Sequence, residues 1–70
     1  MRLSIRNQLT GVITDVSLGA VMATVKVQID GTDQTITSSI TRDAALDLGL
    51  VTGMRATVLV KSTEVAIGIE

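Results

Sequence analysis

Apolar and polar residues alternate along most of the chain, and this period of two is typical of β-strands with one buried face. The clearest case is the segment 21–29, whose apolar row is formed by Val21, Ala23, Val25, Val27 and Ile29. Asp30-Gly31-Thr32-Asp33 follows and predicts a hairpin turn, because Asp-Gly supplies residues that tolerate positive φ angles. Residues 36–40 then form the expected return strand.

The same alternation predicts three more strands. In segment 12–18, one face is expected to carry Val12, Thr14, Val16 and Leu18. Segments 54–61 and 65–69 are expected to form the fourth and fifth strands. Residues 1–6 precede all of these strands as an extended arm that is half apolar.

The period changes at residues 41–49, which predict a short helix of about two turns. Thr41 suits the N-cap, Asp43 the first turn and Gly49 the C-terminal end. Three strands, one helix and two strands is the order of elements in an OB-fold barrel. The sequence therefore predicts a mainly β fold: a five-stranded OB-like barrel with one short helix between the third and fourth strands. Residues 1–70 are expected to form it as a single domain.

The composition leaves more apolar surface than one small domain can cover. Of the 70 residues, 46% are apolar and none is aromatic, and the mean hydropathy is +0.50. A domain of this size buries only about 60% of the surface that its unfolded chain exposes. The surplus predicts a homo-oligomer, because subunit interfaces would bury it.

The charge balance argues against nucleic acid as a partner. The chain has six Lys and Arg residues and seven Asp and Glu residues, so its net charge is −1. A non-specific nucleic-acid binder, in contrast, carries a basic excess. OB-folds that bind single strands also use stacking aromatic residues, which this chain lacks. With no signal-peptide pattern and no apolar run of about 18 residues, we expect a cytoplasmic protein without a membrane partner.

Catalysis is not expected either. The chain has no His and no Cys, which removes the usual general base at neutral pH and the usual soft metal ligands. The seven carboxylates are scattered, without the spacing of a hydrolytic pair or a hard-metal site. Lys61 and Ser62 are adjacent on an expected strand, so their side chains should point to opposite faces and form no dyad. We expect neither an enzyme nor a bound cofactor or directly ligated metal.

Two polar clusters, residues 4–11 and 61–65, stand at opposite ends of the sequence. Each combines a cation, Arg6 or Lys61, with hydroxyl or amide donors, and this combination is what an oxyanion-binding site needs. Ser4 and Arg6 should share one face of the extended arm. The alternative is two solvated charges at strand ends, because the sequence does not show that the clusters meet.

The start of the expected helix is a second candidate. The Thr41 hydroxyl and the free backbone N–H groups that follow it, including that of Ala44, could make a small anion site. Ala20 lies in the small-residue connection 19–21, where a ligand could approach the main chain. The alternatives are a plain N-cap and an ordinary turn.

Residues 4–11, Ser-Ile-Arg-Asn-Gln-Leu-Thr-Gly, resemble the N-terminal SARNQLKG signature of the molbindins. These are small cytoplasmic molybdate-binding proteins, also found as TOBE-type domains in molybdate regulators and transporter ATPases. Further matches follow in order at Gly19-Ala20-Val21, Ile40-Thr41, Leu48-Gly49-Leu50, Lys61-Ser62-Thr63-Glu64-Val65 and Ile67-Gly68-Ile69-Glu70. The resemblance covers essentially the whole chain.

The resemblance implies an OB-like fold that assembles as a homohexamer, a trimer of dimers, and binds molybdate between subunits. The positions that look like molybdate contacts in the family are Ser4, Arg6, Thr41, Lys61 and Ser62. Ala20 lies in a loop that resembles a backbone-donating segment of a second class of site. Ala44 stands where many relatives carry Ser, so only its backbone N–H remains, and Ile5 replaces the usual Ala.

The expected function is therefore storage or buffering of molybdate by a non-enzymatic protein. One alternative is a tungstate carrier, because tungstate has nearly the same size, charge and shape. Another is a structural or regulatory oligomerisation module that ignores oxyanions.

Overall fold

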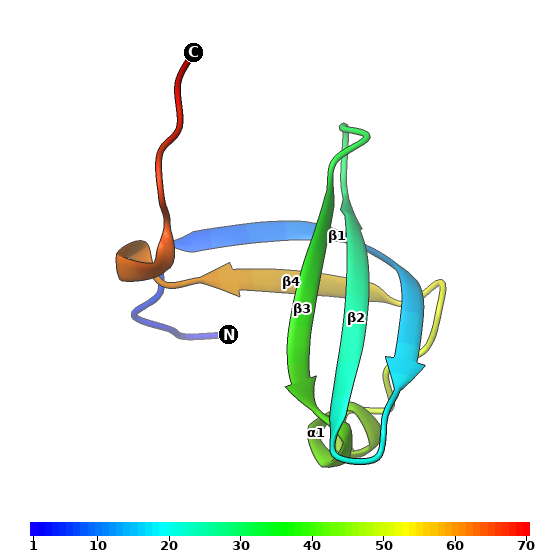
Figure 1. The fold of residues 1–70 in the computed structure, drawn as a ribbon. Helices are drawn as coiled ribbons and strands as arrows, with labels where there is room; N and C mark the ends of the chain where they lie inside the picture. Colours follow the sequence, from blue (N-terminus) through cyan, green and yellow to red (C-terminus); the bar gives the residue numbers. More distant parts are fainter.

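The computed structural model describes residues 1–70 and contains four strands, one α-helix and one 3₁₀ turn (Figure 1). In chain order they are β1 (Asn7–Leu18), β2 (Met22–Ile29), β3 (Thr35–Thr41), α1 (Arg42–Asp47), β4 (Arg55–Val60) and η1 (Ser62–Glu64). The mainly β fold and the helix between the third and fourth strands are confirmed.

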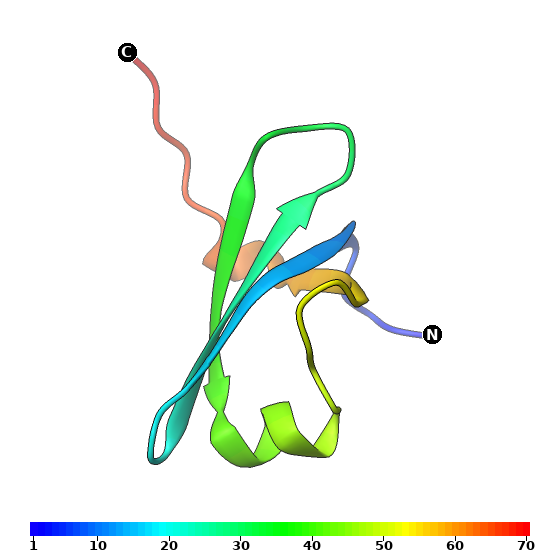
Figure 2. The same ribbon diagram turned by 90° about the vertical axis from the view of Figure 1, so that its right-hand side faces the viewer.

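The strands form one antiparallel sheet in the order β3-β2-β1-β4. Strand β1 is long and bent, and it serves both halves of the sheet. Residues 7–12 pair with β4, while residues 11–18 pair with β2. The sheet therefore curls into two arms that meet at a corner (Figures 1 and 2), which is the open form of an OB-like barrel.

Gly11 lies at this corner and is required there. A Cβ atom at this position would lie 2.2 Å from the backbone oxygen of Gln28. Gly11 is paired with Ile29 on one side and with Ala56 on the other. Only a residue without a side chain lets the three strands approach this closely.

A β-bulge changes the buried face of β1. The pairing with β2 shifts register between Ile13 and Asp15, so Thr14 is an extra residue. A bulge breaks the alternation of a strand, and as a result Ile13, 1% exposed, and Val16 both pack in the core. The predicted face with Thr14 and Leu18 was wrong in this respect, since both are exposed.

The core lies against the concave side of the sheet. Ile13, Val25 and Val27 form its buried centre. The half-buried residues packed against them are Val16, Ile29, Ile40, Leu50, Ala56 and Val58. The predicted apolar row of residues 21–29 is confirmed at its centre, whereas Val21 at its start is 72% exposed.

The helix α1 begins and ends as its sequence predicts. The Ala44 N–H donates to the Thr41 hydroxyl at 3.1 Å, which caps the first turn. Ala45 packs the helix onto the sheet, and Gly49 takes a φ of 64° just beyond the C-cap residue Leu48. No helix is long and apolar enough to span a membrane.

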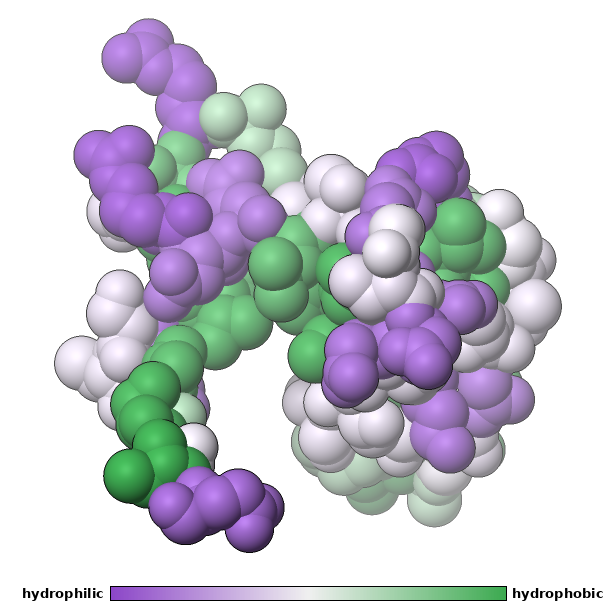
Figure 3. Space-filling model, turned by 90° about the horizontal axis from the view of Figure 1, so that it is seen from above, coloured by the Kyte–Doolittle hydropathy of each residue, from purple (hydrophilic) through white to green (hydrophobic).

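The predicted fifth strand is absent from the sheet. Residues 65–70, called here the C-terminal segment, are extended beyond η1 and stand clear of the body (Figure 1). Their alternation suits a strand, yet a strand needs a neighbour to satisfy its backbone groups. None of the backbone N–H groups of residues 66–70 donates a hydrogen bond within the chain. In the view from above, a part of the chain projects from the body, and most of its surface is apolar (green in Figure 3).

Candidate functional site

The pairing of β1 with β4 brings the two polar clusters together. Asn7 is paired with Val60 at the end of this ladder. Arg6 and Lys61 are the next residues on either side, so they leave the sheet next to each other. They border a shallow hollow of about 160 Å³ whose lining consists of Ser4, Ile5, Arg6, Lys61, Ser62 and Thr63. Four of the seven predicted site residues thus meet within one chain.

The turn η1 explains how Lys61 and Ser62 reach the same hollow. The strand ends at Val60, and the Glu64 N–H donates to the Lys61 carbonyl at 2.9 Å, which closes the turn. Strand alternation therefore stops before Lys61. The prediction that Lys61 and Ser62 lie on a strand was wrong, and both residues line the same hollow, although no hydrogen bond joins their side chains.

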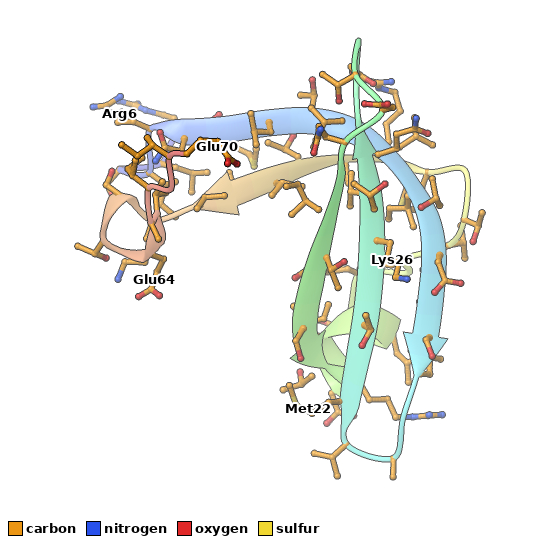
Figure 4. All side chains as sticks on the ribbon, turned by 45° about the horizontal axis from the view of Figure 1, so that its top comes forward. Arg6, Met22, Lys26, Glu64 and Glu70 are labelled. Carbon is orange, nitrogen blue, oxygen red and sulfur yellow. The ribbon has the colours of Figure 1, made fainter.

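The two cations of the hollow have no acidic partner in the chain. The one ion pair of the protein joins Arg55 to Asp30 and involves neither Arg6 nor Lys61. Glu64 lies at the same end of the molecule as Arg6, but the two side chains point away from each other (Figure 4). Two free positive charges beside three hydroxyl groups make the hollow suited to an anion with several oxygen atoms.

The other three predicted residues, Ala20, Thr41 and Ala44, form a second cluster at the helix end of the molecule. The Arg42 guanidinium donates to the Gly19 carbonyl at 3.1 Å, and the Arg42 N–H donates to the Val21 carbonyl at 2.8 Å. These bonds hold the turn containing Ala20 against the start of α1. This role of Arg42 was not predicted from the sequence, where a cation directly after the N-cap was the only available signal.

The donors of this second cluster are partly used by the fold. The Ala44 N–H is occupied by the cap to Thr41, so it is not a free donor as expected. The Thr41 hydroxyl accepts that bond and keeps its own hydrogen to donate. The Ala20 N–H donates no hydrogen bond within the chain.

The hollow and the second cluster lie far apart in a single chain. Figure 1 places η1 at the end of one arm of the sheet and α1 at the end of the other. No single anion can therefore touch all seven predicted residues of one copy. The chain also has no group of three acidic, His or Cys residues that could hold a metal ion.

The Asp30–Arg55 ion pair lies at the corner of the sheet and belongs to neither cluster. Arg55 donates to the Asp30 carboxylate, and Thr10 donates to it at 3.2 Å. Hydrogen bonding from Arg55 is the main reason why the pKa of Asp30 is lowered, and the same bond raises the pKa of Arg55. The pair connects the β2–β3 hairpin to β4.

Comparison with known proteins gives consistent matches. The TOBE domain family matches residues 3–67. Molybdenum-pterin-binding protein 3 of Clostridium pasteurianum is 43% identical over 67 residues, which are 96% of this chain and 97% of that protein. The solved structure of MopII from Clostridium pasteurianum superposes with a TM-score of 0.90 at 40% identity, covering 97% of this chain and 100% of MopII. ModG, described as a cytoplasmic molybdate-binding protein and solved with molybdate bound, has a TM-score of 0.81 at 40% identity. That match covers 89% of this chain and 43% of ModG.

Proposed function

Because the chain belongs to the molbindin family of TOBE domains, we propose that it binds molybdate reversibly and stores or buffers it in the cytoplasm. ModG supports both the ligand and the compartment, since it is described as a cytoplasmic molybdate-binding protein. The observation that carries the proposal is the meeting of Arg6 and Lys61 at one hydroxyl-lined hollow without a carboxylate partner.

In this proposal the oxyanion is held by charge-assisted hydrogen bonds and stays chemically intact. Arg6 and Lys61 supply the positive charge, and the hydroxyl groups of Ser4 and Ser62 donate to the remaining oxygens. No bond to molybdenum forms, because hydroxyl, guanidinium and ammonium groups all act as donors here. The protein therefore needs no catalytic residue and no cofactor, and we propose that it is not an enzyme.

The second cluster would serve a different class of site. There the free Ala20 N–H and the Thr41 hydroxyl are the donors. Ala44 contributes by fixing the Thr41 side chain through the cap, rather than by touching the anion. Two clusters at two ends of the molecule are compatible with two kinds of site in an assembly.

We further propose that the working form is a homohexamer, a trimer of dimers, with the oxyanions at its subunit interfaces. The hollow is shallow in a single copy, so a neighbouring copy would have to exclude water from the bound anion. Exposed apolar residues near both clusters support such contacts, among them Val65 at 48% and Leu46 at 54% exposed. No nucleic acid or membrane is needed in this proposal.

Tungstate is the second candidate ligand. It has nearly the same size, charge and tetrahedral shape as molybdate, and hydrogen-bond donors sense only these properties. Nothing in the hollow selects one metal over the other.

Native mass spectrometry tests the proposal directly. The protein is measured without anion and then with molybdate, tungstate and sulfate in turn. We expect mass increments of whole molybdate or tungstate units on an oligomer, with sulfate bound weakly or not at all. An assembly whose mass never changes would favour an oligomerisation module and overturn the proposed function.

A further inference from the structure

Arg42 holds the turn between β1 and β2 at two of its carbonyl groups. Its guanidinium donates to the Gly19 carbonyl at 3.1 Å, and its backbone N–H donates to the Val21 carbonyl at 2.8 Å. These two residues stand on either side of Ala20. The turn directly precedes Met22, which is labelled at the start of β2 in Figure 4. The first residue of α1 thus fixes the turn that carries one of the candidate anion donors.

The turn lacks the hydrogen bond with which a tight turn usually fixes its first carbonyl. In a β-turn, the N–H of the fourth residue often donates to the carbonyl of the first. Here only the reverse bond is formed, from the Gly19 N–H to the Met22 carbonyl at 2.8 Å. The Arg42 guanidinium therefore replaces the missing donor, and it sets the orientation of the peptide group between Gly19 and Ala20.

This orientation leaves the Ala20 N–H available. The chain has no cis peptide bond, and a trans peptide directs its carbonyl and its N–H to opposite sides. Because the Gly19 carbonyl faces Arg42, the Ala20 N–H faces the other way. That N–H donates no hydrogen bond within the chain, and Ala20 is exposed. The turn thus presents a free donor outwards, while two carbonyls that would repel an anion are bound to Arg42.

Arg42 also brings the positive charge at this end of the molecule. It is the only cation in the segments 19–22 and 41–47, which form the turn and the helix with its N-cap. No carboxylate pairs with it, since the one ion pair of the protein joins Asp30 to Arg55. A charged donor on a carbonyl polarises the whole peptide group and makes its N–H a stronger donor.

We propose that Arg42 is the positioning residue of the second cluster. It orients and polarises the peptide group between Gly19 and Ala20, so that the Ala20 N–H donates to a tetrahedral oxyanion beside the Thr41 hydroxyl. Arg42 acts through this peptide and does not touch the anion, because it is bound on the carbonyl side. The inference rests on the proposed function, since it concerns the second of the two clusters described there.

The side chain of Arg42 is not needed to attach the helix to the sheet. The bond from the Arg42 N–H to the Val21 carbonyl extends the β2–β3 ladder beyond the pair Met22–Thr41, and it does not involve the side chain. Ala45, 2% exposed, packs α1 onto the sheet as well. What the guanidinium adds is the orientation of the turn, and this effect can be measured separately from stability.

The first test follows amide resonances in two-dimensional NMR spectra while molybdate is added to the unchanged chain and to Arg42→Met. Methionine keeps a long, helix-forming side chain but has no hydrogen-bond donor and no charge. We expect the Ala20 amide of Arg42→Met to respond at roughly tenfold higher molybdate concentration, and the Ser62 amide at the hollow to respond as before. If Arg42→Met were less stable in urea but its Ala20 amide responded normally, Arg42 would be a structural tie only and the inference would be overturned.

A second set of variants separates hydrogen bonding from net charge. Arg42→Lys keeps the charge and a donor, and we expect it to restore most of the Ala20 response. Asp43 is exposed and directly follows Arg42. Combining Asp43→Asn with Arg42→Met returns the net charge to −1 without restoring a donor, so this double variant should stay defective at Ala20. A full recovery in the double variant would show that charge alone acts, and it would overturn the positioning role.

The same titration distinguishes failure of the inference from failure of the proposed function. If no amide of the unchanged chain responds to molybdate, both are overturned. If the Ser62 amide responds and the Ala20 amide does not, molybdate binding at the hollow stands and the inference alone is overturned. Arg42→Ala, which has the highest helix propensity, replaces Arg42→Met if that variant does not fold.

Discussion

Arg6 and Lys61 lie directly beyond Asn7 and Val60, the terminal residue pair of the β1–β4 ladder. The antiparallel register of these two strands thus places two cations, which are 55 positions apart in the sequence, beside one hollow. This placement is the basis of the first prediction.

Removing either cation should abolish most anion binding at the hollow. Hydrogen bonds to charged groups contribute about 1.5–3 kcal/mol, so Arg6→Ala or Lys61→Ala should weaken molybdate binding there by roughly 10- to 100-fold. Isothermal titration calorimetry measures the change. Lys26→Ala removes an exposed cation from the middle of β2 (Figure 4) and should leave the affinity unaltered. Unchanged molybdate affinity in both Arg6→Ala and Lys61→Ala would contradict the assignment of the hollow as the anion site.

Thr41 should contribute to stability and to anion binding through different atoms. Thr41→Ala removes the acceptor of the Ala44 N–H, and loss of such a cap costs about 1 kcal/mol. Thr41→Asp restores an acceptor for the cap but replaces the hydroxyl donor with a negative charge. We therefore expect Thr41→Asp to unfold in urea like the unchanged chain and to lose anion binding at the second cluster. If Thr41→Asp retained full binding at every site, Thr41 would be a cap and nothing more.

The Asp30–Arg55 pair should make a small, pH-dependent contribution to stability. Hydrogen bonding from Arg55 lowers the pKa of Asp30 below its ordinary value of 3.8 in the folded protein. The stabilisation is therefore fully present above about pH 4 and is lost as the pH falls through the lowered pKa. Asp30→Asn should lower the melting temperature at pH 7, and the difference from the unchanged chain should shrink below pH 3.8. Asp33→Asn, in the same hairpin but without an ion pair, should show neither effect.

Gly11→Ala should be strongly destabilising. The added Cβ would lie 2.2 Å from the Gln28 oxygen, so β1 and β2 would have to separate. Overpacking of this kind costs about 1–3 kcal/mol or more, which urea denaturation can measure. Ser17→Ala, at an exposed position of the same strand, should change the free energy of unfolding by less than about 0.5 kcal/mol. A Gly11→Ala protein as stable as Ser17→Ala would show that the corner tolerates a side chain.

The sequence was informative wherever the determining contacts are local. The apolar row around Val25 predicted β2, and Thr41 predicted the start of α1, because alternation and capping act over a few residues. The bulge at Thr14 could not be predicted, since adjacent Val12 and Ile13 are both apolar and either could have faced the core. The meeting of Arg6 and Lys61 also depends on the register between distant strands, which residue patterns alone do not determine.

The error at the C-terminal segment has a different origin. The alternation of Val65, Ile67 and Ile69 correctly describes a sequence suited to a strand. Whether it joins a sheet depends on an available edge, and none is reached within the single chain. Likewise, Lys61 and Ser62 were assigned to a strand because no residue marks the turn η1, which is closed by backbone hydrogen bonds alone.

The corner of the sheet has a consequence for the internal motions of the protein. Gly11 and Val12 are the residues of β1 that are paired with β2 on one side and with β4 on the other. Thr10 and Ile13 beside them are also held on both sides, because the Asp30 N–H donates to the Thr10 carbonyl and the Ile13 N–H donates to the Met54 carbonyl. Residues farther toward either end of β1 are paired on one side, so either arm can open while the other stays closed. Amide hydrogen exchange should accordingly be slowest around this corner and faster toward both ends of β1. The hollow and the helix end would then fluctuate independently, each about the same slowly exchanging centre.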